Sequence, residues 1–243
     1  MTPAPWIKRF PADGPGAPGV AVVFPHAGGA AAAYRPLANA LSANGVETHL
    51  LQYPRRADRL THPASETLTE LADQLYQAAD WRQAGPLQLF GHCMGAVVAF
   101  EFARIAEADG VAVHRLWASA GHDPGTVTEA APLPDTDEGV LADMVDLGGT
   151  DPRLLDDEDF VELLLIAVHV DYRALNRYSC DPDARIAAGI HAVGGTTDHR
   201  VTAAQLRRWE SYTRGSFALT TFEGGHFYLN EHLDAVTKLM SVE

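Results

Sequence analysis

Residues 91–95, which read GHCMG, carry the sharpest chemical signal in the sequence. They follow an apolar run that predicts a strand, and they precede a stretch that predicts a helix. This context is typical of a nucleophile elbow, G-x-S-x-G, with Cys93 in the place of the serine. The dipole of the following helix favours a reactive thiolate there. A buried structural cysteine is the alternative interpretation, but the agreement of five positions with both flanking elements favours a nucleophile.

A nucleophile needs a base and a group that orients the base. Of 11 histidines, His226 stands out because it lies in the loop GGHF, residues 224–227, directly after the last predicted strand. Asp198 ends the segment GGTTD, residues 194–198, after the preceding strand. An ordinary turn aspartate is the alternative interpretation of Asp198. The chain order of nucleophile, acid and histidine predicts a catalytic triad of Cys93, Asp198 and His226.

Two backbone N–H groups are candidates for an oxyanion hole. One belongs to Met94, directly after the nucleophile, and the other to Ala27 in the loop FPHAGG, residues 24–29. The two glycines of that loop would also suit a phosphate cradle. However, the sequence contains neither a G-x-G-x-x-G nor a P-loop pattern, and no Cys/His grouping has zinc spacing. We therefore expect no metal and no cofactor.

Strands and helices alternate on both sides of these motifs. This alternation predicts an α/β fold with a mostly parallel sheet and helices on both faces. Residues 1–19, which are rich in proline and glycine, are predicted to be irregular. The expected strands are 20–24, 46–53, 87–90, 111–118, 186–193 and 217–222, and the expected helices are 30–43, 64–80, 96–108, 202–213 and 231–240.

The alternation stops over residues 121–180, where most of the negative charge lies. The chain has 18 basic and 32 acidic residues, a net charge of −14. Residues 121–171 hold 14 of the acidic residues and one basic residue, so this window carries −13. Its expected helices are 137–147 and 157–176. An insertion at this point of an α/β sheet predicts a lid over the carboxyl edge, with the apolar run 163–166 facing the ligand.

Length and composition limit the remaining classes. A chain of 243 residues fits one domain, 1–243, with the lid as an insertion. The acidic balance argues against binding to nucleic acid and to anionic membranes. Two cysteines are too few for a disulfide framework, and we see neither a signal peptide nor a membrane span. We therefore expect a cytoplasmic protein.

Together, the motifs FPHAGG, PRRADRL, LFGHCMGAVVAFEFAR, LGGT, VDYRALNRY, GGTTD and GGHFYL resemble those of the type II thioesterases. These are external α/β-hydrolases of polyketide and nonribosomal peptide pathways. The resemblance covers nearly the whole chain. It implies an α/β-hydrolase fold with a helical lid, and hydrolysis of acyl groups from phosphopantetheine-bound carrier proteins, often to clear stalled units. It also implies that the nucleophile is Cys93 and that the triad is completed by Asp198 and His226. The oxyanion hole would be formed by the N–H groups of Ala27 and Met94.

Three positions depart from the family pattern. The elbow has cysteine where the family usually has serine. The PGR loop of the family reads PRR at residues 54–56, and its lid segment PxLRADF reads IAVHVDY at residues 166–172. The expected contacts with substrate or carrier are, on these segments, Arg55, Arg56, Arg59, His169, Asp171 and Tyr172. Since carrier proteins are typically acidic, we expect the three arginines to form the docking surface; an ordinary solvated loop is the alternative.

Three functions remain compatible with the sequence. The first is a cysteine thioesterase working through an acyl-enzyme. The second is an acyltransferase or cyclase that passes the Cys93-bound acyl group to an amine or hydroxyl, because a thioester acyl-enzyme reacts readily with such nucleophiles. The third is a binding protein that holds acyl-carriers without turnover. A deliberate replacement of serine, made to trap an acyl intermediate, would also leave a cysteine at position 93.

Overall fold

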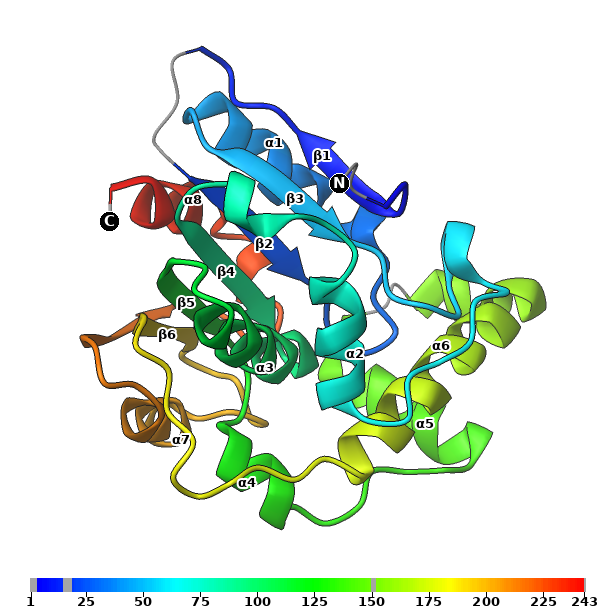
Figure 1. Ribbon diagram of the computed structural model, residues 1–243. Helices are drawn as coiled ribbons and strands as arrows, with labels where there is room; N and C mark the ends of the chain where they lie inside the picture. Colours follow the sequence, from blue (N-terminus) through cyan, green and yellow to red (C-terminus); the bar gives the residue numbers. More distant parts are fainter. Residues whose placement is uncertain (1–3, 15–18, 150–151, 243) are drawn as a thin grey trace.

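A seven-stranded sheet forms the centre of the molecule (Figure 1). The computed structural model describes residues 4–14, 19–149 and 152–242. The strand order is β1-β3-β2-β4-β5-β6-β7, and β2 to β7 pair in parallel through the whole sheet. This confirms the predicted α/β-hydrolase class. The strands are β1 (Ile7–Phe10), β2 (Val20–Phe24), β3 (Glu47–Leu51), β4 (Leu87–His92), β5 (Val113–Ser119), β6 (Gly189–Gly195) and β7 (Phe217–Phe222).

Strand β1 corrects the prediction that residues 1–19 are irregular. It pairs antiparallel with β3 at the edge of the sheet, with Ile7 opposite Leu51. Only Ile7 among its four residues is buried, so the strand lacks the apolar alternation that makes a strand visible in a sequence. Parts of that prediction, residues 1–3 and 15–18, lie outside the described residues.

Helices cover both faces of the sheet, as expected. On one face, α1 and α8 bury Leu37, Leu41, Val236 and Met240 against β2 and β4. On the other, α2 and α3 pack against each other and on the sheet. No helix in the described segments is long and apolar enough to cross a membrane. The helices are α1 (Arg35–Ala43), α2 (Leu68–Tyr76), α3 (Met94–Ala108), α4 (Pro124–Glu129), α5 (Asp137–Leu147), α6 (Glu158–Asn176), α7 (Ala203–Arg207) and α8 (Leu233–Val242).

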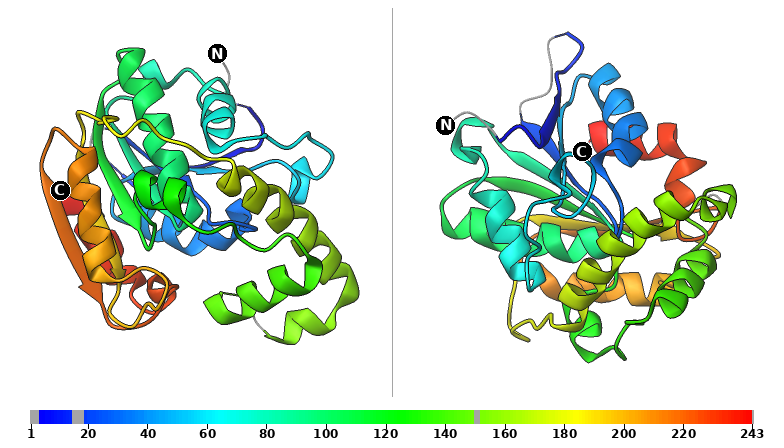
Figure 2. Two further views of the ribbon diagram at one scale, coloured as in Figure 1. Left: turned by 90° about the horizontal axis from the view of Figure 1, so that it is seen from below. Right: turned by 90° about the vertical axis from the view of Figure 1, so that its right-hand side faces the viewer.

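The segment between β5 and β6 carries α4, α5 and α6, which we call the lid. Helices α5 and α6 stand apart from the sheet, beyond the end of the strands (Figure 2). Side chains cap the start of each lid helix: Asp123, Thr136 and Asp157 accept hydrogen bonds from backbone N–H groups of the first turns. Several lid acids therefore lie at helix starts, where the helix dipole favours them.

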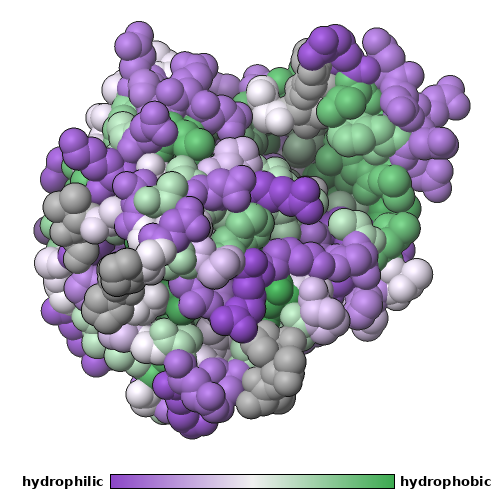
Figure 3. All heavy atoms as spheres, turned by 90° about the horizontal axis from the view of Figure 1, so that it is seen from above, coloured by the Kyte–Doolittle hydropathy of each residue, from purple (hydrophilic) through white to green (hydrophobic). Residues whose placement is uncertain are grey.

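The expectation that the apolar run 163–166 faces the ligand is wrong, because none of these four residues lines the cavity at Cys93. Leu163 is 48% exposed, and Val145 and Leu154 on the lid are exposed as well. Hydrophobic atoms also gather on the lid side of the molecule in the view from above (Figure 3). The cavity is instead lined by the last two turns of α6, at Tyr172, Leu175 and Asn176. Three or four consecutive apolar residues span a full helical turn, so the sequence alone does not say which face is buried.

Candidate active site

Cys93 stands on a strained turn between β4 and α3. Its φ of +55° and ψ of −121° place it outside the regions that non-glycine residues normally adopt. A Cβ atom on Gly91 would lie 2.2 Å from the backbone oxygen of Gly95, and one on Gly95 would lie 2.1 Å from that of Phe24. Both glycines are therefore required by close backbone packing. The turn has the form of the predicted nucleophile elbow, with the side chain at the end of β4.

His226 and Asp198 form a buried hydrogen-bonded pair. Nδ1 of His226 lies 2.9 Å from Oδ2 of Asp198, and the two residues are 4% and 5% exposed. The other carboxylate oxygen accepts the backbone N–H groups of Arg200 (2.8 Å) and Val201 (3.1 Å). Burial by itself would raise the pKa of Asp198, but the hydrogen bonds from His226 and the backbone outweigh it and lower the pKa. Asp198 is thus held as a carboxylate that orients the imidazole.

The charge of Cys93 acts on His226. Burial by itself would lower the pKa of His226, but the negative charge of a Cys93 thiolate and the hydrogen bond with Asp198 raise it to about 10. Within the described residues, Nε2 of His226 is buried and makes no hydrogen bond. Both residues line the same cavity. With this pKa, the imidazole of His226 holds its proton at neutral pH.

The loop after β2 lies next to Cys93, in the wall of the same cavity. Ala27 and Met94 both line the cavity at Cys93. Met94 is the first residue of α3, so its N–H has no acceptor within the helix. The loop is fixed by the lid, because the N–H of Gly28 donates to Oδ2 of Asp171 on α6 at 2.8 Å. Two N–H groups on rigid backbone beside Cys93 suit the stabilisation of a developing oxyanion.

A cavity of about 310 Å³ joins the elbow to the lid. We call it the acyl chamber. Its walls come from the elbow, from the loop after β5, and from all three lid helices. Apolar side chains dominate these walls, among them Val97, Val127, Leu133, Met144 and Leu147. Such a lining suits an apolar chain whose reacting carbonyl lies at Cys93.

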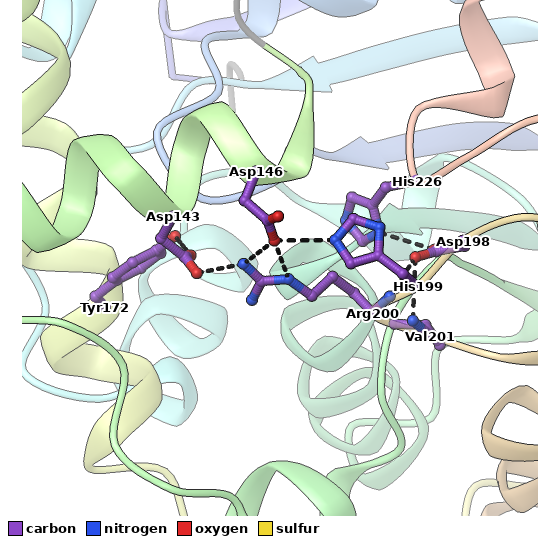
Figure 4. Close-up of polar contacts among 8 residues, drawn as sticks. All are labelled: Asp143, Asp146, Tyr172, Asp198, His199, Arg200, Val201 and His226. Carbon is purple, nitrogen blue, oxygen red and sulfur yellow. Dashed lines mark hydrogen bonds and ion pairs between the residues drawn. The ribbon is translucent and has the colours of Figure 1, made fainter.

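Arg200 ties the lid to the loop that carries Asp198 (Figure 4). Its guanidinium pairs with Asp143 and with Asp146 on α5, the latter at 3.0 Å. His199 adds a contact of 2.9 Å to Asp146, and Tyr172 of α6 donates to Asp143 at 2.5 Å. Because the backbone N–H of Arg200 also holds Asp198, one residue contacts both the lid and the acid.

The prediction that Arg56 and Arg59 form a docking surface is wrong, because these side chains are only 5% and 6% exposed. Arg56 forms two hydrogen bonds of 2.6 and 2.7 Å with Asp171 and a third with the carbonyl of Gly29. Arg59 donates to the carbonyl of Gln52. Their role here is to hold the loop, α6 and the body together. A loop rich in arginine looks solvated in a sequence, and the burying partner, Asp171, is more than 100 residues away.

The other expected contacts lie in different places. Arg55 is partly exposed, and its φ of +66° is a conformation that favours glycine, which explains the glycine usual in the family. Tyr172 lines the acyl chamber as expected. Asp171 faces Arg56 and does not line the chamber, and His169 pairs with Asp137 on the lid at 2.6 Å. Helical spacing explains the split, since neighbours in α6 point to different sides.

Several residues of the site were not foreseen. Arg200 and Asp143 line the acyl chamber, as do His122 and His26. The sequence shows that Arg200 follows Asp198 by two residues. It does not show that Arg200 pairs with Asp143 and Asp146 on α5. Among the described residues, no group of three or more His, Cys, Asp or Glu side chains is arranged to hold a metal ion.

Comparison with known proteins places this architecture in a family. A family model described as "Thioesterase domain" matches residues 21–241. The chain belongs to the thioesterase family. The thioesterase is 61% identical over 239 residues, 98% of its length, to the phenyloxazoline synthase MbtB of Mycobacterium tuberculosis, of which the match covers 17%. It is 40% identical to a probable cadicidin biosynthesis thioesterase of Streptomyces griseus, over 97% of this chain and 64% of that protein.

The solved structures agree with the family. The type II thioesterase BorB from the borrelidin biosynthetic cluster superposes with a TM-score of 0.85 at 37% identity, over 100% of this chain and 98% of that one. The thioesterase thus resembles a type II enzyme over its whole length and also a small part of a much longer synthase. The chain spans only 17% of the length of the synthase and 64% of the length of the cadicidin relative.

Proposed function

We propose that the protein hydrolyses acyl groups from carrier-bound phosphopantetheine in a polyketide or nonribosomal peptide pathway, through a covalent intermediate on Cys93. The observation that carries the proposal is that Cys93, on its strained elbow, lines one apolar chamber together with His226, which is hydrogen-bonded to the buried Asp198. The relatives support the pathway class, since their names refer to borrelidin and cadicidin biosynthesis.

The chemistry runs in two halves. In the first, the thiolate of Cys93 attacks the thioester carbonyl, and the oxyanion is stabilised by the N–H groups of Ala27 and Met94. The bond from carbon to the pantetheine sulfur breaks, and His226 supplies the proton to the departing thiol. In the second half, water attacks the acyl-Cys93 thioester while His226 accepts its proton. The carbon–sulfur bond to Cys93 then breaks and releases the free acid.

A product assay with a purified acyl-carrier tests this proposal. The released acid and the deacylated carrier are measured in parallel, with and without an added primary amine. We expect equal amounts of acid and free carrier, and a loss of at least about a thousandfold in the Cys93→Ala variant. Deacylation that yields amide or cyclic product in place of acid would show transfer. Undiminished turnover in the variant would reject the role of Cys93.

A Cys180→Ala variant is the matched control, because Cys180 is the other cysteine of the chain and does not line the acyl chamber. It should retain full activity. If the two variants lost activity equally, the loss would reflect cysteine content or folding and not the elbow.

A further inference from the structure

A second cavity, of about 190 Å³, lies beside the acyl chamber. The two share His26 and Phe227 as a common wall. The second cavity reaches the surface, since its lining includes the exposed residues Ala33, Pro36 and Asn230. Its approach therefore lies between α1, the loop before α8 and Gly149, the residue of the lid segment that also lines it. We call it the rear cavity.

His92 of the elbow forms the inner end of the rear cavity. It is 1% exposed, and its Nδ1 lies 2.9 Å from Oγ of Ser119, which in turn contacts the hydroxyl of Tyr228. Its Nε2 is buried and has no hydrogen-bond partner among the described residues. A buried polar atom of this kind is normally satisfied by ordered water. Burial and the positive charge of His226 lower the pKa of His92, so the ring is neutral and suited to bind water.

The rear cavity ends close to the catalytic histidine. The ring centres of His92 and His226 are 5.3 Å apart, and Phe227 packs 5.2 Å from each of them. His26 closes the wall, with its Nδ1 on the hydroxyl of Tyr34 at 2.7 Å and its ring 5.1 Å from Phe227. His26 and Phe227 are thus the lining residues that the two cavities share.

We propose that the rear cavity supplies the water that hydrolyses the acyl-enzyme, with Nε2 of His92 as its anchor and the contact between His26 and Phe227 as its point of entry. The inference rests on the covalent mechanism proposed above. An acyl group on Cys93 fills the apolar chamber and excludes water from that side. The hydrolytic step nevertheless needs one water at Nε2 of His226. A separate approach meets both requirements, because its largely apolar wall includes four hydrogen-bonding side chains: His26, His92, Tyr34 and Asn230.

The step balances without a further reactant. A water held at His92 moves past His26 to the acyl carbonyl, and its oxygen forms the new bond to carbon. His226 takes one proton of the water at Nε2. The carbon–sulfur bond breaks, the electron pair returns to Cys93, and the acid leaves. His92 is a positioning residue in this scheme, because it touches the water and not the acyl group.

The experiment separates acylation from deacylation. Each protein is mixed with octanoyl-N-acetylcysteamine, and mass spectrometry follows the released thiol and the acyl adduct on Cys93. In Ala33→Phe, a phenyl ring fills the exposed mouth of the rear cavity. We expect an unchanged rate of thiol release in the first turnover and a decay of the adduct slowed by about tenfold or more, so that the adduct accumulates.

The chain offers a matched control in Ala32→Phe. Ala32 is exposed on the same 3-10 helix (Ala31–Tyr34) but does not line the cavity. Its adduct should decay as in the wild type. His92→Asn is a second test, since the asparagine amide can replace Nδ1 toward Ser119 while Nε2 is lost, and it should also slow decay more than acylation.

Two negative results have different meanings. Adducts that decay at the wild-type rate in Ala33→Phe and His92→Asn would overturn the water route and leave the covalent mechanism standing. Hydrolysis by the wild type with no adduct in single turnovers, together with activity in Cys93→Ala, would overturn the covalent mechanism and this inference with it.

Discussion

At the scale of single residues, cysteine at the elbow places an ionisable group beside His226. A serine hydroxyl stays neutral at ordinary pH, whereas a cysteine thiol readily gives a thiolate. The structure shows the consequence at His226, whose pKa is raised to about 10 by the Cys93 charge and by Asp198. With this pKa, His226 holds its proton at neutral pH and can donate it to a departing thiol.

Replacing Cys93 by serine tests this charge pairing. Cys93→Ser removes the negative charge but keeps the hydrogen bond to Asp198, so we expect the pKa of His226 to fall from about 10 toward the ordinary 6.5. As the pH rises from 7 to 9, the variant should lose the imidazolium proton while the wild type keeps it. Imidazole NMR signals recorded against pH measure both values. An unchanged pKa in the variant would show that Cys93 does not carry the charge.

The proximity of Cys93, Asp198 and His226 could be predicted from the sequence because each of them lies in a short local motif. Cys93 sits between two glycines, Asp198 follows β6, and His226 follows β7. The carboxyl ends of neighbouring parallel strands meet at one edge, so chain order was enough to bring the loops together. The buried ion pair of Arg56 with Asp171 could not be predicted, because charged residues are usually exposed. These two are buried only because α6 packs on the loop after β3, which is distant in the sequence.

At the scale of elements, two groups of ion pairs between the lid and the body lie near the site. One is the buried pair of Arg56 and Asp171, and the other is the partly exposed group of Arg200 with Asp143 and Asp146. The second group also holds Asp198 through the backbone of Arg200. We therefore expect movement of α5 to affect the position of Asp198.

Removing the ion pairs of Arg200 with Asp143 and Asp146 should make local unfolding of α5 easier and leave the sheet unchanged. Arg200→Gln leaves Asp143 and Asp146 without their cation, which should lower the opening free energy of α5 by about 1 kcal/mol. Amide exchange over residues 137–147 should then be roughly fivefold faster, because RT ln 5 is about 1 kcal/mol. Arg207→Gln, an exposed arginine on α7, is the control. Equal exchange in α5 of both variants would contradict the tether.

The elements themselves were well predicted where their patterns are strong. Helix α5 and strand β7 begin and end where the sequence placed them, at 137–147 and 217–222. Strand β1 and the short helix α4 were missed, since four or six residues give too few apolar repeats to stand out. The side of α6 that faces the chamber was also misjudged, because the run 163–166 surrounds the helix axis.

At the scale of the whole molecule, the charge of −14 divides into a nearly neutral body and an acidic lid. An acidic carrier is repelled by the lid. With Arg56 and Arg59 buried, only Arg55 of the three predicted arginines remains accessible at the surface. We therefore propose carrier contact at Arg55 alone.

Reversing the charge at Arg55 tests this contact. Arg55→Glu should raise KM for acyl-carrier by about threefold to tenfold, equivalent to 0.7–1.4 kcal/mol, and leave the kcat/KM of a small acyl thioester unchanged. Arg55→Gly is the control, because glycine suits the positive φ and removes the charge without reversing it. Equal losses on both substrates would point to a damaged loop and reject docking.

Mass spectrometry can establish whether Cys93 carries a covalent acyl group during turnover. The protein is mixed with a panel of acyl thioesters, quenched in acid within milliseconds to seconds, and digested to locate the added mass. We expect one acyl group per chain, on the peptide that carries Cys93, which appears before free acid and then decays. An adduct confined to Cys180, or acid produced with no adduct at any time, would contradict the account.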